Sequence, residues 1–345
     1  MKRFLAALAV AGLASTTLLA QEGPGAEYRK SVAVDPALPS YVPRALSPPE
    51  AGGFLLPGGE IQILGNDGDR KLMQLWTAAF AKHHPQIRFK LNLAGSSVGI
   101  AGLYTGVSLF APMGREIWPV EVTPFEKMLG YKPFEIRTSR GSYDVEGRSG
   151  AIAVYVHRDN PVEKLTMDQL AAIFSAGVER PGITYWGQLG LKGEWAYRRI
   201  HLYGTLGEGG RARFFAQRVL AGAPPASDIE GERKRGDTVQ RVKEDVGGIG
   251  ITGFGHPGAK RVALAESDAG PYSNGSLADV AAGKYPLSRF TYIYARRPPG
   301  APLDPVTKEF LRFVLSKQGQ ELVVKEGVLL PLSADIARAE LAKLD

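Results

Sequence analysis

The sequence contains no cysteine, and this absence excludes several kinds of site and linkage. Disulfide bonds, thiolate metal centres and a lipid anchor on an N-terminal cysteine all require that residue. A chain of 345 residues without them must be held together by its own apolar core, and it is long enough for two lobes rather than one.

Motifs of several enzyme and metalloprotein classes are also missing. The sequence has no Walker phosphate loop and no dinucleotide fingerprint opening a βαβ unit. The adjacent His83 and His84 end a predicted helix and lack the spacing of a zinc site. We therefore expect no metal and no cofactor.

The N-terminus has a short apolar run with a positive start. Lys2 and Arg3 precede the apolar residues 4–13, and cleavage is expected after Ala20. This is the layout of a secretory signal peptide, since about ten apolar residues are too few to span a bilayer. A buried N-terminal helix is the alternative. With no cysteine to carry a lipid, a signal peptide at 1–20 predicts a periplasmic protein that is not a lipoprotein.

Positive charge exceeds negative charge, with a formal net charge of +7. Such a balance favours anionic partners through long-range attraction. The compact basic cluster at 233–235 is flanked by acidic residues, so a solvated loop is favoured and no nucleic-acid partner is expected.

Residues 21–59 are rich in proline and glycine, which interrupt any helical or strand period. We expect an arm here, either a tether or an extended segment over the first lobe, and not a folded domain.

From Ile61 onward, the apolar residues alternate between strand and helix periods. Strands are predicted at 61–63 and 87–93, and helices at 72–80 and from Ile100. This βαβ pattern predicts a parallel sheet. Further strands are expected at 151–156, 246–251 and 290–294, and further helices after a Thr166–Gln169 capping box, at 212–220 and at 310–315.

Three strand-to-helix turns are built from residues suited to an anion, at 65–68, 95–99 and 207–211. The first turn of a helix has backbone N–H groups without partners, and glycine lets that backbone approach an oxyanion. Asn66 or Asp67 alone would also fit a helix cap. Arg211 strengthens the third turn because a guanidinium can pair with two oxygens at once.

The second turn also fits a different chemistry. Gly95-x-Ser97-x-Gly99 matches the nucleophile elbow of serine hydrolases, which sits between a strand and a helix. His157, His201 and His256 follow it in the chain and would have to supply the base. A serine hydrolase using Ser97 is therefore an alternative, although we expect no enzyme.

The order of these turns resembles that of the periplasmic phosphate-binding proteins of ABC-type phosphate importers. The resemblance runs from Ile61 to Leu332, and residues 151–174, with Asn160-Pro161, carry its closest match. Other matching segments are 61–76, 94–99, 113–116, 249–251 and 326–332.

The resemblance implies a type II periplasmic binding protein fold. This fold has two α/β lobes, each a mainly parallel sheet flanked by helices, joined by two crossover strands around a ligand cleft. Lobe 1 would comprise 60–153 and 255–345, and lobe 2 would comprise 154–254. The expected partners are a small oxyanion, with phosphate first, and a membrane ABC permease, and the expected state is a monomer. The candidate ligand-binding residues are Asn66, Asp67, Gly68, Ser96, Ser97, Arg115, Gly209, Gly210 and Arg211.

The third turn departs from the family pattern. An Arg before Ser-Gly-Thr is absent, and Glu208 introduces a carboxylate there. Arg211 or Arg115 would replace the missing Arg. Glu208 either repels a dianion, accepts a proton from HPO₄²⁻, or points to solvent. A diverged binding or sensor module with another ligand is therefore a further alternative.

Overall fold

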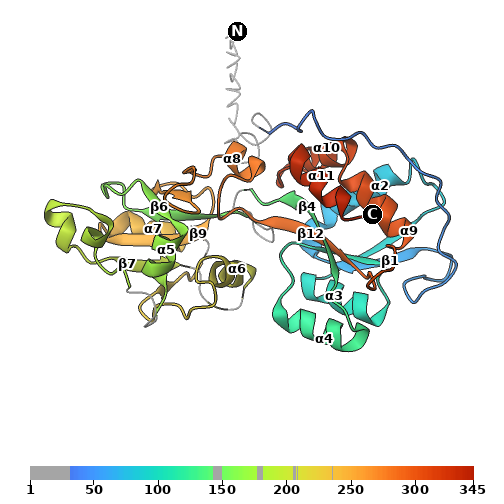
Figure 1. The fold of residues 1–345 in the computed structure, drawn as a ribbon, viewed down its shortest axis with the longest axis horizontal. Coiled ribbons are helices and arrows are strands. Elements are labelled where there is room, and N and C mark those ends of the chain that lie inside the picture. Colours follow the sequence, from blue (N-terminus) through green and yellow to red (C-terminus); the bar gives the residue numbers. More distant parts are fainter. Residues whose placement is uncertain (1–31, 143–149, 177–181, 205–206, 208, 235) are drawn as a thin grey trace, which may run out of the picture.

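The computed structural model describes residues 32–345 apart from 143–149, 177–181, 205–206, 208 and 235. The predicted signal peptide and Glu208 lie outside the described residues. The chain forms two lobes side by side, each with its own buried apolar cluster (Figure 1). Within the described ranges, every helix is too short or too polar to cross a lipid bilayer.

Lobe 1 combines two small sheets with helices on their faces. Its strands are β1 (Ile61–Gly65), β2 (Phe89–Leu93), β3 (Phe110–Met113), β4 (Phe134–Arg140) and β12 (Phe290–Ala295). Strand β1 pairs with β2 in parallel, whereas β12 lies between β3 and β4 and is antiparallel to both. Its helical segments are η1 (Asp67–Asp69), α2 (Arg70–Phe80), α3 (Ser96–Thr105), α4 (Pro119–Leu129), α9 (Pro305–Val314), α10 (Lys317–Glu326) and α11 (Ala334–Ala342).

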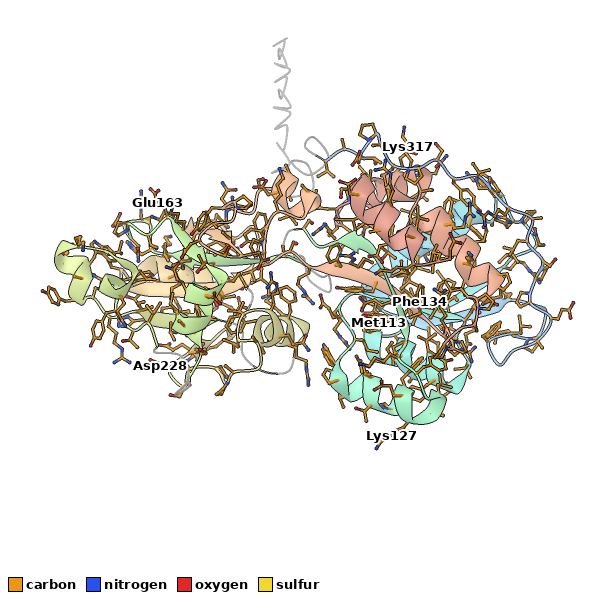
Figure 2. The ribbon with its side chains drawn as sticks, viewed as in Figure 1. Met113, Lys127, Phe134, Glu163, Asp228 and Lys317 are labelled. Carbon is orange, nitrogen blue, oxygen red and sulfur yellow. The ribbon has the colours of Figure 1, made fainter. Side chains whose placement is uncertain are left out.

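Lobe 2 is built on a five-stranded mixed sheet. In spatial order its strands are β10 (Lys260–Arg261), β5 (Ile152–Val156), β9 (Gly248–Gly253), β7 (His201–Gly204) and β8 (Glu230–Gly231). A separate parallel pair joins β6 (Lys164–Thr166) to β11 (Ala263–Ala265). Its helical segments are α5 (Met167–Phe174), η2 (Trp186–Leu189), η3 (Gly193–Tyr197), α6 (Gly210–Arg218), α7 (Asp237–Glu244) and α8 (Leu277–Ala282). Figure 2 shows the side chains, with Met113 and Phe134 in lobe 1 and Glu163 and Asp228 in lobe 2.

The local patterns explain several of these elements directly. Helix α2 buries Leu72, Trp76 and Phe80, which recur on one face. Helix α5 begins with the predicted capping box: the Gln169 N–H donates to Thr166 Oγ1 (3.1 Å), and the Thr166 N–H donates to Gln169 Oε1 (2.9 Å).

The lobes are joined near the end of β4 and the start of β12. The Gly141 N–H donates to the Arg289 carbonyl (2.9 Å), so the two crossing segments run beside each other. Residues after 254 do not return at once to lobe 1 as expected, since Val262, Leu264 and Val280 belong to the apolar cluster of lobe 2. The pairing of β10 with β5 and of β11 with β6 keeps this segment there, a tertiary contact that periodicity does not reveal.

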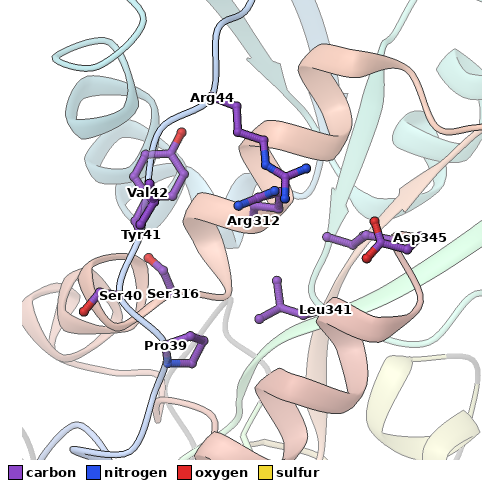
Figure 3. A pocket seen from close by; sticks show the side chains of 10 residues that line it. Pro39, Ser40, Tyr41, Val42, Arg44, Arg312, Ser316, Leu341 and Asp345 are labelled. Carbon is purple, nitrogen blue, oxygen red and sulfur yellow. The ribbon is translucent and has the colours of Figure 1, made fainter.

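Val32, at the start of the described part of the arm, packs against the apolar cluster of lobe 2, and the arm then runs over lobe 1 from Val34 to residue 59. Tyr41 anchors it, because its hydroxyl donates to Glu309 Oε1 (2.8 Å) and lies 2.7 Å from His84 Nε2. The Lys317 N–H also donates to the Pro39 carbonyl (2.8 Å). A pocket of about 200 Å³ lies between the arm, α9 and the C-terminus, lined in part by Arg44 and Arg312 (Figure 3).

Candidate ligand-binding site

The first predicted turn follows β1 and uses its side chains internally. A Cβ atom on Gly65 would overlap the backbone of Pro112, so glycine is required where β1 approaches β3. Asn66 Nδ2 donates to Asp69 Oδ2 (3.0 Å), while Asp67 is exposed and Gly68 is half-buried. The amide of Asn66 therefore stabilises the turn itself.

The second turn opens α3 and packs tightly on the sheet. Gly95 has a φ of 128°, a conformation that favours glycine, and Ser96 and Ser97 are the first two residues of α3. A Cβ atom on Gly99 would lie 2.9 Å from the Cβ of Ala111 and 3.1 Å from the Cα of Gly65. Gly99 therefore lets α3 lie close against β1 and β3, next to the first turn.

Ser97 is exposed, but its hydroxyl is bonded to a buried pair formed by an arginine and a glutamate. Arg115, in the loop after β3, donates from Nη2 to Glu121 Oε1 (2.6 Å) and from Nη1 to Glu121 Oε2 (2.8 Å). Ser97 Oγ donates to Glu121 Oε1 (2.6 Å) and accepts from Arg115 Nη2 (3.0 Å), and the Trp118 N–H donates to Glu121 Oε2 (2.8 Å). The carboxylate of Glu121 thus accepts the hydrogen bonds of Arg115, Ser97 and Trp118, which an external anion would otherwise accept.

The charge of Glu121 is stabilised in place. Burial alone would raise the pKa of its carboxyl, but hydrogen bonds from Arg115, Ser97 and Trp118 outweigh burial and hold the pKa below its ordinary value. Sequence reasoning missed Glu121. The available signal was a capping pattern, with Pro119 at the first position of α4 and a glutamate three residues after Trp118.

The third turn brings lobe 2 against lobe 1 at the start of α6. Figure 1 shows α6 at the edge of lobe 2 that faces lobe 1. A Cβ atom on Gly210, its first residue, would lie 3.5 Å from Arg115 Cδ and 3.6 Å from Arg289 Nη2. The guanidinium of Arg213 also lies 4.3 Å from the ring centroid of Trp118. We call this meeting of α6 with Arg115, Trp118 and Arg289 the interlobe contact.

The backbone at the start of α6 has no side-chain cap. Gly209 occupies the N-cap position and accordingly makes no side-chain cap hydrogen bond to the helix. Arg211 pairs within lobe 2, with its Nη1 3.0 Å from Glu232 Oε2 and 3.3 Å from Thr252 Oγ1. The structure thus brings Ser97, Arg115 and Gly210 to one region but binds Arg211 to a carboxylate of its own lobe.

The partners of Ser97 differ from those of a hydrolase nucleophile. Its hydroxyl is bonded to Glu121 and Arg115, whereas a serine triad joins the hydroxyl to histidine. His201 instead lies 2.7 Å from Asp245 in lobe 2. The Gly-x-Ser-x-Gly pattern reflects the close packing at Gly99, and this geometry favours binding over acyl transfer.

Comparison with known proteins identifies the family. The model of the PBP superfamily domain matches residues 55–318. The phosphate-binding protein PstS of Pseudomonas aeruginosa PAO1 is 33% identical over 351 residues, which cover 100% of this chain and 99% of that relative. The chain belongs to the PstS family. The resemblance inferred from the turns is thereby confirmed, and the prediction of a binding protein rather than an enzyme agrees with this membership.

A more distant sequence relative also matches this chain, and two solved structures share its architecture. Protein SphX of Synechococcus elongatus is 25% identical over 260 residues, covering 74% of this chain and 72% of SphX. PstS from Borrelia burgdorferi superposes with a TM-score of 0.56 at 18% identity, covering 79% of this chain and 98% of that one. An ABC-type phosphate transport receptor from Vibrio cholerae superposes with a TM-score of 0.51 at 21% identity, covering 79% of this chain and 100% of that one. The predicted two-lobe α/β fold is confirmed, with mixed rather than mainly parallel sheets.

Proposed function

We propose that this protein captures phosphate, or a related tetrahedral oxyanion, between its lobes and delivers it to an ABC-type importer. The observation that carries the proposal is the 33% identity, over the whole chain, to a protein named for phosphate binding. We place the protein in the periplasm as a monomer, with residues 1–20 removed on export.

The interlobe contact supports this proposal physically. The starts of α3 and α6 both present backbone N–H groups without partners in their own helix, and their dipoles add partial positive charge. An oxyanion between the lobes would accept hydrogen bonds from these N–H groups and from the hydroxyl of Ser96, and a guanidinium at the contact would pair with its charge. Binding needs no covalent step, since preorganised hydrogen-bond donors and a cation supply the affinity.

Calorimetry on the phosphate-free protein tests the proposal. We expect phosphate to bind with a Kd in the micromolar range or below, and sulfate, molybdate and citrate to bind more weakly. Absence of binding to every oxyanion would overturn the proposal, and tight binding of citrate alone would favour a diverged module with another ligand.

The location is tested separately from the ligand. Expression with the native N-terminus, followed by cell fractionation, should give a periplasmic protein whose first residue is Gln21. Retention of Met1 in the cytoplasmic fraction would contradict the proposed export without affecting the ligand.

A further inference from the structure

Arg289 is a buried cation at the junction of the lobes that the sequence analysis did not single out. It immediately precedes β12, its residue is only 5% exposed, and its carbonyl accepts the N–H of Gly141 from the other crossing segment. Its Nη2 lies 3.6 Å from the position a Cβ atom would take on Gly210. A guanidinium of lobe 1 therefore lies against the N-terminus of α6 in lobe 2.

Within the part of the chain that the structure describes, the charge of Arg289 is poorly compensated. The carboxylate that pairs with it there is that of Glu116, and its Oε2 lies 3.9 Å from Arg289 Nη2, which is too far for a hydrogen bond. Glu116 itself accepts a hydrogen bond at Oε1 from the hydroxyl of Tyr292 (3.0 Å). Among the described residues the buried Nε of Arg289 has no hydrogen-bond partner. Burial accordingly lowers the pKa of Arg289, and Glu116 opposes that effect only in part.

The other arginines considered for the ligand are already bonded to carboxylates. Arg115 is held by both oxygens of Glu121, and Arg211 pairs with Glu232. A guanidinium whose N–H groups already donate to a carboxylate has few donors left for a ligand. Buried N–H groups without an acceptor destabilise the protein, and a ligand that accepts from them removes this free-energy penalty. This difference singles out Arg289.

We propose that Arg289 supplies the guanidinium group that pairs with the bound oxyanion, and that Glu116 is the carboxylate the oxyanion displaces from it. The inference rests on the proposed function. A phosphate placed between Arg289 and the first turn of α6 would accept from the guanidinium and from the N–H groups near Gly210 together. Arg289 thus takes the role that the sequence analysis assigned to Arg115 or Arg211.

Substitution of Arg289 is the direct test, with Arg140 as the matched control. Arg140 is equally buried, also has an unpartnered Nε among the described residues, and lies on the adjacent crossing segment, but it contacts Ser288 and the ring of Phe290. We expect Arg289→Gln to weaken phosphate binding by about 100-fold in calorimetry, and Arg140→Gln to stay within about 3-fold of the unchanged protein. Equal affinities for the two folded variants would overturn the inference.

A second pair of variants decides the matter even if Arg289→Gln does not fold. Glu116→Gln removes the competing charge and should raise phosphate affinity by about 3-fold. Glu135→Gln is its control, because Glu135 likewise accepts a tyrosine hydroxyl, that of Tyr294, and accounts for any general charge effect. An affinity of Glu116→Gln equal to or below that of Glu135→Gln would overturn the inference.

The two proposals fail in different ways. If the unchanged protein binds no oxyanion, the proposed function is wrong. If the unchanged protein binds phosphate and the four variants fail to separate as described, the proposed function stands and the role of Arg289 is wrong.

Discussion

The helices α3 and α6 begin alike, each after a glycine N-cap that makes no side-chain hydrogen bond to the helix. Their surroundings differ. Beside α3, the hydroxyl of Ser97 and the guanidinium of Arg115 are bonded to the carboxylate of Glu121. At the start of α6, two glycines leave the backbone accessible and Arg289 is close by with a weak partner. A cation beside a helix start is therefore available to a ligand only if no carboxylate of the protein is already paired with it.

The largest expected effect comes from breaking the network beside α3. Glu121→Gln leaves the Arg115 charge buried without its bidentate partner and should lower the free energy of unfolding by about 3 kcal/mol. Urea denaturation followed by circular dichroism measures the change. Glu126→Gln, the same change on the partly exposed face of α4, is the control and should cost less than about 0.5 kcal/mol.

The pH dependence of unfolding sharpens this result. Because the pKa of Glu121 in the folded protein lies below its ordinary value of 4.5, its contribution is fully present above pH 4.5 and is lost as the pH falls through the folded pKa. Stability should therefore fall more steeply below pH 4.5 in the unchanged protein than in Glu121→Gln. Parallel profiles for the two proteins would show that the carboxylate contributes nothing.

Local patterns in the sequence account for most of the elements around the site. Alternating residues predicted β1 and β2, helical spacing predicted α2, and the Thr166 capping box predicted the start of α5, because each depends on neighbours in the chain. The pairing of Arg115 with Glu121 and the place of Arg289 beside Gly210 were not predicted. Each depends on side-chain direction or on how segments far apart in sequence meet, and periodicity carries no information on either.

A smaller effect is expected from adding a methyl group at the two helix starts. Gly99→Ala would place a Cβ atom 2.9 Å from the Cβ of Ala111 and should cost about 2 kcal/mol, since α3 cannot move away from the sheet without losing its packing. Gly209→Ala meets no described atom within 4 Å, and its φ of −68° suits alanine, so stability should change by less than about 0.5 kcal/mol. Thermal denaturation compares the two.

The two variants also separate packing from ligand access. If the start of α6 binds the oxyanion, Gly209→Ala should weaken phosphate binding in calorimetry while leaving the melting temperature unchanged. A loss of stability at Gly209 as large as that at Gly99 would contradict the difference drawn between the two helix starts.

The smallest expected effect separates the neighbouring serines of α3. Ser97→Ala removes a hydroxyl that donates to Glu121 and accepts from Arg115, so it should lower the free energy of unfolding by about 1 kcal/mol. Ser96→Ala should leave stability within about 0.3 kcal/mol, because no bond of its hydroxyl to another described residue is broken. For phosphate binding we expect the opposite ranking of the two variants. Ser96→Ala should weaken binding by several-fold, because a hydrogen bond to the ligand is lost. Ser97→Ala should leave binding nearly unchanged, because the Ser97 hydroxyl already donates to Glu121. Equal effects of both serines on binding would show that the network beside α3 opens when the ligand arrives.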